Sequence, residues 1–411
     1  MTHRSAPSPT LPDLPAFTDL PAQADPPDAL RTFAGQRVTT PDMWREQRRS
    51  ELLALFSHYV YGPRPPAPAH PPRTRELMRD RTLLDGRAEL REIELHLDEP
   101  RDITMRLLLA LPRDRDAPAP TLLAFNRCGN HATHPHPQIQ LPERWVPFTD
   151  TQGEHRADDA QRGSRAHLWP IERIVARGYA LALWYPGDVS PDDPQFRFSF
   201  SSPNGERVQT GTIAAWAWGA SRALDALVKM PEVDASRVGV LGHSRRGKTA
   251  LLAAAFDERF ALVIPHQAGC GGTAPSRTRN PRAETVKRIN TTFPHWFGER
   301  FAQFGDAVER LPIDQHALIA LAAPRPVLLS NAEDDQWADP PGQMHMLKAA
   351  EPVYHLLGTT GLAGATQPRM QALVGDTLAY FLRPGRHDIT AEDWGAFLDF
   401  ADRHLKPEHE A

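Results

Sequence analysis

A short apolar strand that runs directly into a helix is the feature of this sequence that most constrains its fold. Residues 238–241 are Val-Gly-Val-Leu, and Gly-His-Ser-Arg-Arg-Gly then leads into a stretch rich in alanine and leucine. A serine at such a turn has its hydroxyl exposed above the sheet, and backbone N–H groups at the helix start are free to bind an oxyanion. Arg246 stands where a second glycine is usual, and Gly247 follows one residue later. The pattern predicts a nucleophilic Ser244, the alternative being a serine that only caps a helix.

Further apolar runs predict a mostly parallel sheet around this strand. Two segments of alternating polarity, 89–97 and 104–111, predict an antiparallel pair, and the clearest of the intervening helices spans 211–230. Strands that alternate with helices favour an α/β-hydrolase fold, with a mostly parallel, doubly wound sheet of about eight strands. The buried strand runs are 121–125, 179–184, 238–241, 261–265, 327–330 and 378–382.

The chain divides into three predicted parts. Residues 1–30 are rich in proline, alanine and aspartate, which predicts a disordered or loosely packed arm. Residues 31–85 form an N-terminal helical extension packed on the core, with an amphipathic helix over 40–61. Residues 86–408 form the α/β-hydrolase catalytic domain.

The composition excludes several functional classes. The 411 residues carry a net charge of −4, which gives no basic footprint for a nucleic-acid partner. No stretch approaches the roughly 18 consecutive apolar residues of a membrane span, so no membrane partner is expected. The first 28 residues lack the apolar core of a secretory signal. We therefore expect a cytoplasmic protein, or an exported one if a leader is missing from the sequence.

Histidine and cysteine content indicates neither a metal site nor a cofactor. His131, His134 and His136 lie close together, but prolines interrupt them and no carboxylate or cysteine stands at ligand spacing. Cys128 and Cys270 both follow predicted strand ends, so a disulfide between them is conceivable. Two reduced, buried thiols are the expectation for a cytoplasmic protein. We predict no metal and no cofactor.

Two later loops carry candidate partners for Ser244. In an α/β-hydrolase, an acid and then a histidine follow the serine, each after a strand. His387 lies in a glycine-containing loop after the last predicted strand, where a catalytic base belongs. A run of carboxylates follows the strand over 327–330, where the acid belongs; it contains Glu333, Asp334, Asp335 and Asp339. The alternatives are a surface histidine and a solvated acidic loop.

The motifs, taken together, resemble those of bacterial glucuronoyl esterases, carbohydrate esterase family 15. The resemblance extends in order over about residues 120 to 405, and the serine motif with arginine after the nucleophile and Gly-Lys beyond it is its most specific part. The matching stretches are 214–224, 242–251, 257–264, 269–272, 289–297, 314–316, 323–326, 335–340, 383–388 and 392–394.

The resemblance implies roles for the catalytic residues. Ser244 would attack an ester carbonyl, His387 would take its proton, and the backbone and side chain of Arg245 would stabilise the oxyanion. Some family members carry a glutamate where this chain has Gln267. Because a neutral amide cannot stabilise an imidazolium as a carboxylate does, Asp335 is the predicted acid, with Glu333, Asp334 and Asp339 as alternatives.

Substrate contacts follow from the same resemblance. Lys248 matches a residue that binds sugar hydroxyls, and Trp296 could stack on a sugar or contact its hydroxyls. The alternatives are a surface lysine and a core tryptophan. Gln267 is counted among the substrate-side residues, and Trp184 and Trp337 are further candidates. The loop over 126–131 is either a second oxyanion contact or an ordinary turn.

These features predict a serine carboxylic-ester hydrolase that cleaves esters of glucuronate or 4-O-methyl-glucuronate through an acyl-enzyme. Its partner would be a small-molecule or oligosaccharide uronate ester. The first alternative is the same mechanism on another substrate, such as an acetylated sugar or a small metabolite ester. The second is an inactive hydrolase fold that serves as a carbohydrate-binding module. The sequence makes no prediction of oligomeric state.

Overall fold

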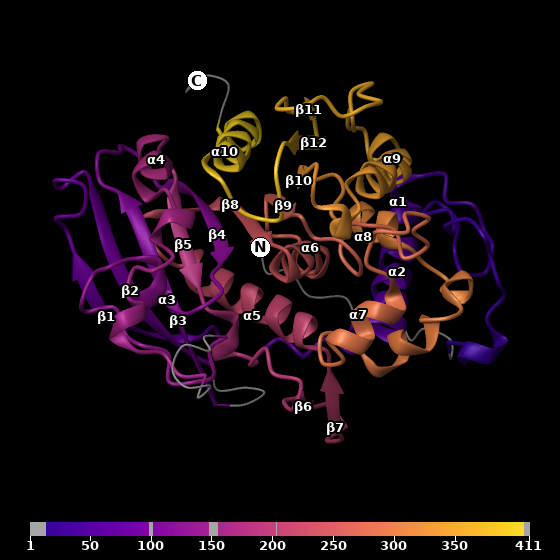
Figure 1. Ribbon diagram of the computed structural model, residues 1–411, viewed down its shortest axis with the longest axis horizontal. Coiled ribbons are helices and arrows are strands. Elements are labelled where there is room, and N and C mark those ends of the chain that lie inside the picture. The colour runs from indigo at the N-terminus through magenta and orange to yellow at the C-terminus, as the bar shows by residue number, and fades with distance from the viewer. Residues whose placement is uncertain (1–13, 98–101, 148–154, 203, 407–411) are drawn as a thin grey trace.

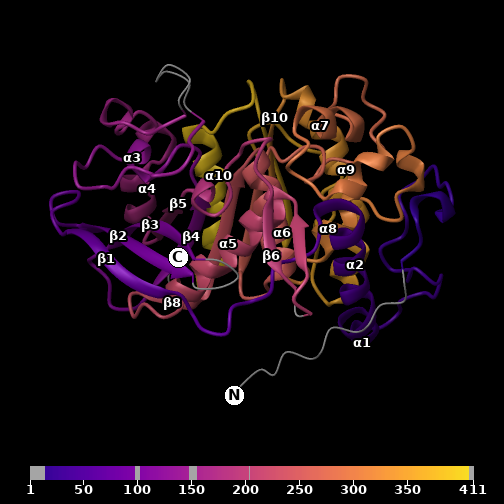
Figure 2. The same ribbon diagram turned by 90° about the horizontal axis from the view of Figure 1, so that it is seen from below.

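The computed structural model describes residues 14–97, 102–147, 155–202 and 204–406. Over these residues the main sheet has ten strands in the order β1-β2-β3-β5-β4-β8-β9-β10-β12-β11 (Figures 1 and 2). Six of these strands run parallel to one another: β5, β4, β8, β9, β10 and β12. The strands β1, β2, β3 and β11 pair antiparallel with their neighbours. The bounds are β1 (Arg73–Asp80), β2 (Ala88–Leu97), β3 (Ile103–Pro112), β4 (Ala119–Phe125), β5 (Ala180–Trp184), β8 (Val233–His243), β9 (Leu262–His266), β10 (Val327–Ala332), β11 (Val374–Gly375) and β12 (Leu378–Arg383).

Each strand expected from the sequence is present, and two edge strands add to them. The expected antiparallel pair is β2 and β3, in which Leu90 faces Ala110. The additional strands are β1, whose sequence Arg-Thr-Arg-Glu-Leu-Met-Arg-Asp has no apolar run, and the two-residue β11. A separate hairpin is formed by β6 (Phe198–Ser201) and β7 (Arg207–Thr210). The sheet is thus wider than the expected eight strands because edge strands need little apolar character.

Helices cover both faces of the sheet, which makes it doubly wound. On one face lie α5 (Thr212–Leu227), α6 (Arg245–Phe256), α8 (Gln315–Ala320) and α9 (Pro340–Leu356). On the other lie α4 (Ile171–Ala176) and α10 (Ala391–Leu405) (Figure 1). Successive residues of a buried strand serve the two faces in turn, so Leu123 packs in the first core and Leu122 in the second. Short helices α3 (Asn130–Thr133) and α7 (Val286–Thr292) lie in loops.

The N-terminal extension is helical over Pro41–Tyr61 and packs against the first face. It consists of α1 (Pro41–Met43), α2 (Arg49–Phe56) and two π-helical segments, Trp44–Arg48 and Ser57–Tyr61. Thr40 caps the start, as its side chain accepts a hydrogen bond from the Met43 N–H. The expected extension ends differently, since its last part is the edge strand β1.

Residues 14–30, part of the expected loose arm, contact the folded domain at a few points. Leu20 is buried, the Tyr59 hydroxyl donates to the Pro15 carbonyl at 2.8 Å, and the His316 Nε2 lies 2.8 Å from the Pro27 carbonyl. Proline-rich chain forms few hydrogen bonds of its own, so side chains of the folded domain satisfy its carbonyls. The rest of that expectation, residues 1–13, lies outside the described residues. None of the helices in the described ranges combines the length and apolar character that a membrane span requires.

Candidate active site

Ser244 lies at the turn between β8 and α6 in a strained conformation. Its φ and ψ are 61° and −126°, a region that non-glycine residues rarely adopt. Two glycines permit this turn. A Cβ on Gly242 would lie 2.0 Å from the Arg246 carbonyl oxygen, and one on Gly247 would lie 2.8 Å from the His266 carbonyl oxygen. The side chain of Arg246 fits where a glycine is usual because it turns away and donates from Nε to the Asn126 carbonyl.

Gly242→Ala is therefore expected to destabilise the fold by about 3 kcal/mol or more, since its new methyl group would overlap backbone that cannot move aside. Urea denaturation measures the change. Gly239→Ala on the same strand is the matched control, because its Cβ would meet the ends of Leu122 and Leu262 at 3.2–3.3 Å. Equal losses for the two variants would contradict this explanation of the motif.

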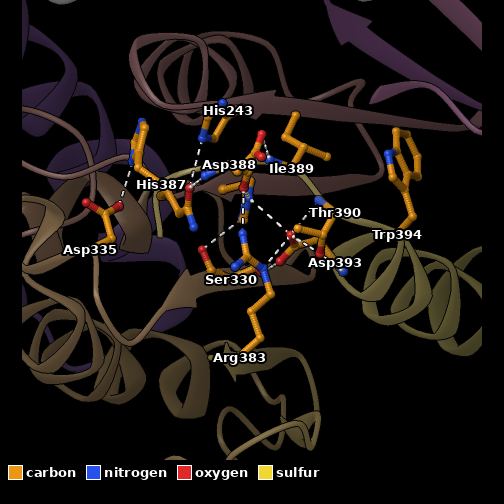
Figure 3. Close-up of polar contacts among 12 residues, drawn as sticks. His243, Ser330, Asp335, Arg383, His387, Asp388, Ile389, Thr390, Asp393 and Trp394 are labelled. Carbon is orange, nitrogen blue, oxygen red and sulfur yellow. Dashed lines mark hydrogen bonds and ion pairs between the residues drawn. The ribbon is translucent and has the colours of Figure 1, made fainter. Parts of the chain in front are cut away.

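His387 and Asp335 meet as expected from the sequence. The Nδ1 of His387, on the loop after β12, lies 2.6 Å from the Oδ2 of Asp335, which follows β10 (Figure 3). The Asp335 side chain is 4% exposed and that of His387 39%. When Nδ1 donates to the carboxylate, Nε2 is left as an acceptor for a serine proton. The alternative acids lie elsewhere: Glu333 and Asp334 are exposed, and Asp339 accepts from the Gly342 N–H as the cap of α9.

A cavity of about 370 Å³ brings the reacting groups together. Ser244 and His387 both line it, and so does Arg245, the first residue of α6. The Arg245 backbone N–H has no acceptor within the helix at this position, so it is available to an oxyanion. Further cations at the wall are the exposed Arg127 and Arg165. The cavity is therefore suited to a substrate that develops or carries negative charge.

Buried polar groups form hydrogen bonds to the loop that carries His387 and fix its position (Figure 3). Arg383 forms an ion pair with Asp393 at 2.7 Å and donates to the Asp388 carbonyl at 2.8 Å. The Gln267 Oε1 accepts from the Asp388 N–H at 3.1 Å and lies 2.8 Å from the Nε2 of His243. Burial lowers the pKa of His243, so this ring is a neutral neighbour. Gln267 is 1% exposed and supports the loop, which is not the substrate contact expected for it.

Trp296, expected as a substrate contact, is buried beside Arg245. It is 3% exposed, its ring stacks on Phe293 at 3.7 Å, and its Nε1 donates to the Asp192 carboxylate at 2.8 Å. The guanidinium carbon of Arg245 lies 4.2 Å from its ring centroid. Trp296 thus packs against Phe293 and the Arg245 guanidinium. Trp184, another aromatic candidate, is fully buried in the core.

Lys248 is buried one helical turn beyond Ser244, beside a carboxylate that the sequence analysis missed. Its ammonium donates to the Ala268 carbonyl, and burial lowers its pKa while Glu284 opposes that shift. Burial likewise raises the pKa of Glu284, against the charge of Lys248. The Glu284 N–H donates to the Trp337 carbonyl at 3.0 Å, and Trp337 is 38% exposed. Glu284 lies in a loop without a motif, so only its position near Lys248 in the structure marks it as a candidate functional residue.

The two cysteines are unpaired, buried thiols. Cys128 lines the cavity near Ser244, whereas Cys270 lies near Lys248. Burial raises the pKa of both thiols, so neither competes with Ser244 as a nucleophile at neutral pH. The loop before α3 is closed by Asn126, whose Oδ1 accepts from the Gly129 N–H at 2.8 Å.

The sheet order and the serine turn define an α/β-hydrolase. A family model described as glucuronyl esterase of fungi matches residues 199–358. Carbohydrate esterase MZ0003, from an unknown prokaryotic organism, is 43% identical over 398 residues, which are 92% of this chain and 89% of that protein. The chain belongs to carbohydrate esterase family 15, and it is a carboxylic-ester hydrolase.

Solved structures agree with this assignment. A promiscuous CE15 esterase from a marine bacterial metagenome is 40% identical to this chain, with a TM-score of 0.83. The matched region covers 95% of this chain and 99% of the chain of that esterase. A glucuronoyl esterase from Solibacter usitatus is 35% identical with a TM-score of 0.82, covering 95% of this chain and 100% of its own.

Proposed function

We propose that this enzyme hydrolyses esters of glucuronate, including 4-O-methyl-glucuronate, through an acyl-enzyme on Ser244. The observation that carries the proposal is the Asp335–His387 contact at 2.6 Å beside a cavity that both His387 and Ser244 line. The relatives named as glucuronoyl esterases support the uronate part of the substrate.

The chemistry takes two steps. In the first, His387 Nε2 takes the Ser244 proton as Oγ attacks the ester carbonyl, and the tetrahedral oxyanion forms at the Arg245 N–H and guanidinium. Collapse of the intermediate breaks the ester bond, and the imidazolium returns the proton to the departing alcohol. In the second step His387 deprotonates a water molecule that attacks the acyl carbon, releasing the uronic acid and restoring Ser244. Asp335 orients the imidazole in both steps.

Lys248, Glu284 and Trp337 are proposed to form the sugar side of the site. A buried ammonium and a buried carboxylate together provide donors and acceptors for neighbouring hydroxyls, and the exposed tryptophan provides an apolar wall. A site built to hydrogen-bond hydroxyl groups discriminates strongly against substrates that lack them.

Lys248→Met is expected to raise KM for methyl glucuronate by roughly 10-fold or more while sparing p-nitrophenyl acetate, which has no sugar hydroxyls. Methionine keeps the buried stem in place. Steady-state kinetics on the two esters measure the difference, with the exposed Lys229→Met as control. Equal losses on both esters would assign Lys248 to the structure or to the general catalytic apparatus.

Turnover of methyl or benzyl glucuronate, compared with acetylated xylan, tests the proposal directly. Preference for the glucuronate esters is the expected result. Preference for the acetylated polymer would indicate an esterase of the same mechanism with another substrate. Binding of an oligosaccharide without hydrolysis of any ester would indicate a carbohydrate-binding module.

A further inference from the structure

One buried carboxylate joins the side chains around Arg245. Asp192 lies in the loop between β5 and β6, and its side chain is 7% exposed. Its Oδ2 accepts from the Arg245 guanidinium at 2.6 Å. Its Oδ1 accepts from the Trp296 indole N–H at 2.8 Å and lies 3.0 Å from the His295 Nε2. Both carboxylate oxygens are therefore engaged, and one of them holds the cation beside Ser244.

The segment that carries His295 and Trp296 is anchored to the start of α5. The N–H groups of Thr212 and Ile213, at the start of α5, donate to the carbonyls of His295 and Trp296 at 2.9 and 3.1 Å. Gly211 allows this approach, since a Cβ there would lie 2.5 Å from the Trp296 carbonyl oxygen. His295 and Trp296, two of the partners of Asp192, are thereby fixed to the first turn of a long core helix.

Arg245 needs such a partner because other cations crowd it. Arg246 and Arg127 both line the same cavity, and like charges repel. Burial lowers the pKa of Arg245 and Arg127 adds to this shift, while Asp192 opposes it. For Asp192, burial would raise the pKa, but His295, Arg245, Arg246 and Trp296 outweigh it and hold the pKa well below its ordinary value. The carboxylate is thus ionised at neutral pH.

We propose that Asp192 is a positioning residue that fixes the Arg245 guanidinium beside the oxyanion formed at Ser244. The inference rests on the proposed function, which assigns Arg245 to the oxyanion. Stabilisation of a developing charge is effective when the donor is oriented before the reaction, so a guanidinium free to follow solvent would contribute much less. Trp296 acts in the same assembly, through its indole N–H and its ring.

Asp192→Asn, which keeps the shape of the side chain, tests the proposal. We expect kcat to fall about 10- to 100-fold with KM changed less than about threefold, on methyl glucuronate and p-nitrophenyl acetate alike, because both esters pass through an oxyanion. Asp225→Asn is the matched control: Asp225 also pairs with arginines, Arg222 at 2.8 Å and Arg259 at 2.7 Å, and should keep wild-type kinetics. A wild-type kcat for Asp192→Asn would overturn the proposal.

A double-mutant cycle separates positioning from a purely structural role. Arg245→Ala alone should lower kcat about 10²- to 10³-fold, and adding Asp192→Asn should lower it no more than about twofold further. If the double variant lost the product of the two single-variant losses in kcat, the inference would be overturned, because Asp192 would then act independently of Arg245. A wild-type kcat for Arg245→Ala would instead overturn the oxyanion role in the proposed function.

Trp296→Phe provides a second test should Asp192→Asn fail to fold. It keeps an aromatic ring but removes the donor to Asp192. A fall in kcat of about 3- to 10-fold with little change in KM is expected, and this loss should disappear in the Arg245→Ala background. A loss that appears in KM, or one that persists without Arg245, would contradict the positioning role.

Discussion

Replacing Ser244 with alanine is expected to lower kcat by about 10⁶-fold, the loss typical of removing a triad serine. Without Oγ no acyl-enzyme forms, and only binding and the oxyanion contacts remain to accelerate attack by water. Turnover of p-nitrophenyl acetate and of methyl glucuronate should fall together. Active-site titration with a slow ester should show no burst of released alcohol from the variant.

A matched control is available on the same strand. Ser236 is exposed near the start of β8, and its hydroxyl donates to Asp234 at 2.6 Å. Ser236→Ala should keep wild-type kcat. More than about a tenth of wild-type activity in folded Ser244→Ala would exclude Ser244 as the nucleophile.

Asp335→Asn is expected to lower kcat by about 10³- to 10⁴-fold with little change in stability. The amide is nearly isosteric, but it cannot stabilise the imidazolium, and its NH₂ can face Nδ1 so that His387 carries its proton on Nε2 instead. His387 Nε2 then already carries a proton and cannot accept the one from Ser244. Steady-state kcat, measured beside the urea midpoint of each variant, checks the expected loss of activity.

The neighbouring carboxylates serve as controls for that variant. Asp334→Asn should leave kcat unchanged, because Asp334 is exposed and the carboxylate paired with His387 is that of Asp335. Asp339→Asn should affect stability more than kcat, since Asp339 caps α9 and accepts from the Thr278 hydroxyl at 2.7 Å. A larger kcat loss for either of these variants than for Asp335→Asn would reassign the acid.

The expected strands were recovered because their signals are local. A buried strand between two helical layers carries consecutive apolar residues, and such a run is present in each of β4, β5, β9 and β10. The strand β1 has no such run, because it lies at the sheet edge with most of its side chains exposed. The contacts of residues 14–30 carry no local signal either, since their carbonyls accept hydrogen bonds from side chains far along the chain.

The roles of Gln267 and Trp296 could not be assigned from sequence position. Trp296 is 104 residues from Asp192, and Gln267 is 121 residues from the Asp388 N–H that it binds. Trp296 stands in a motif stretch, and Gln267 stands where some family members carry a glutamate, so the sequence marks both as important. Whether such a side chain faces the substrate or supports a catalytic residue depends on which segment packs against it.

The sequence by itself determined the serine turn, the alternation of strands and helices, and the two loops that supply His387 and an acid. These features depend on a few consecutive residues, whose backbone preferences and apolar spacing act locally. Only the tertiary structure decided that Asp335, among neighbouring carboxylates, meets His387, and that Asp192 and Trp296 hold Arg245. The reason is that β10, β12 and the loops of residues 192 and 296 approach one another only when the sheet and its helices are assembled.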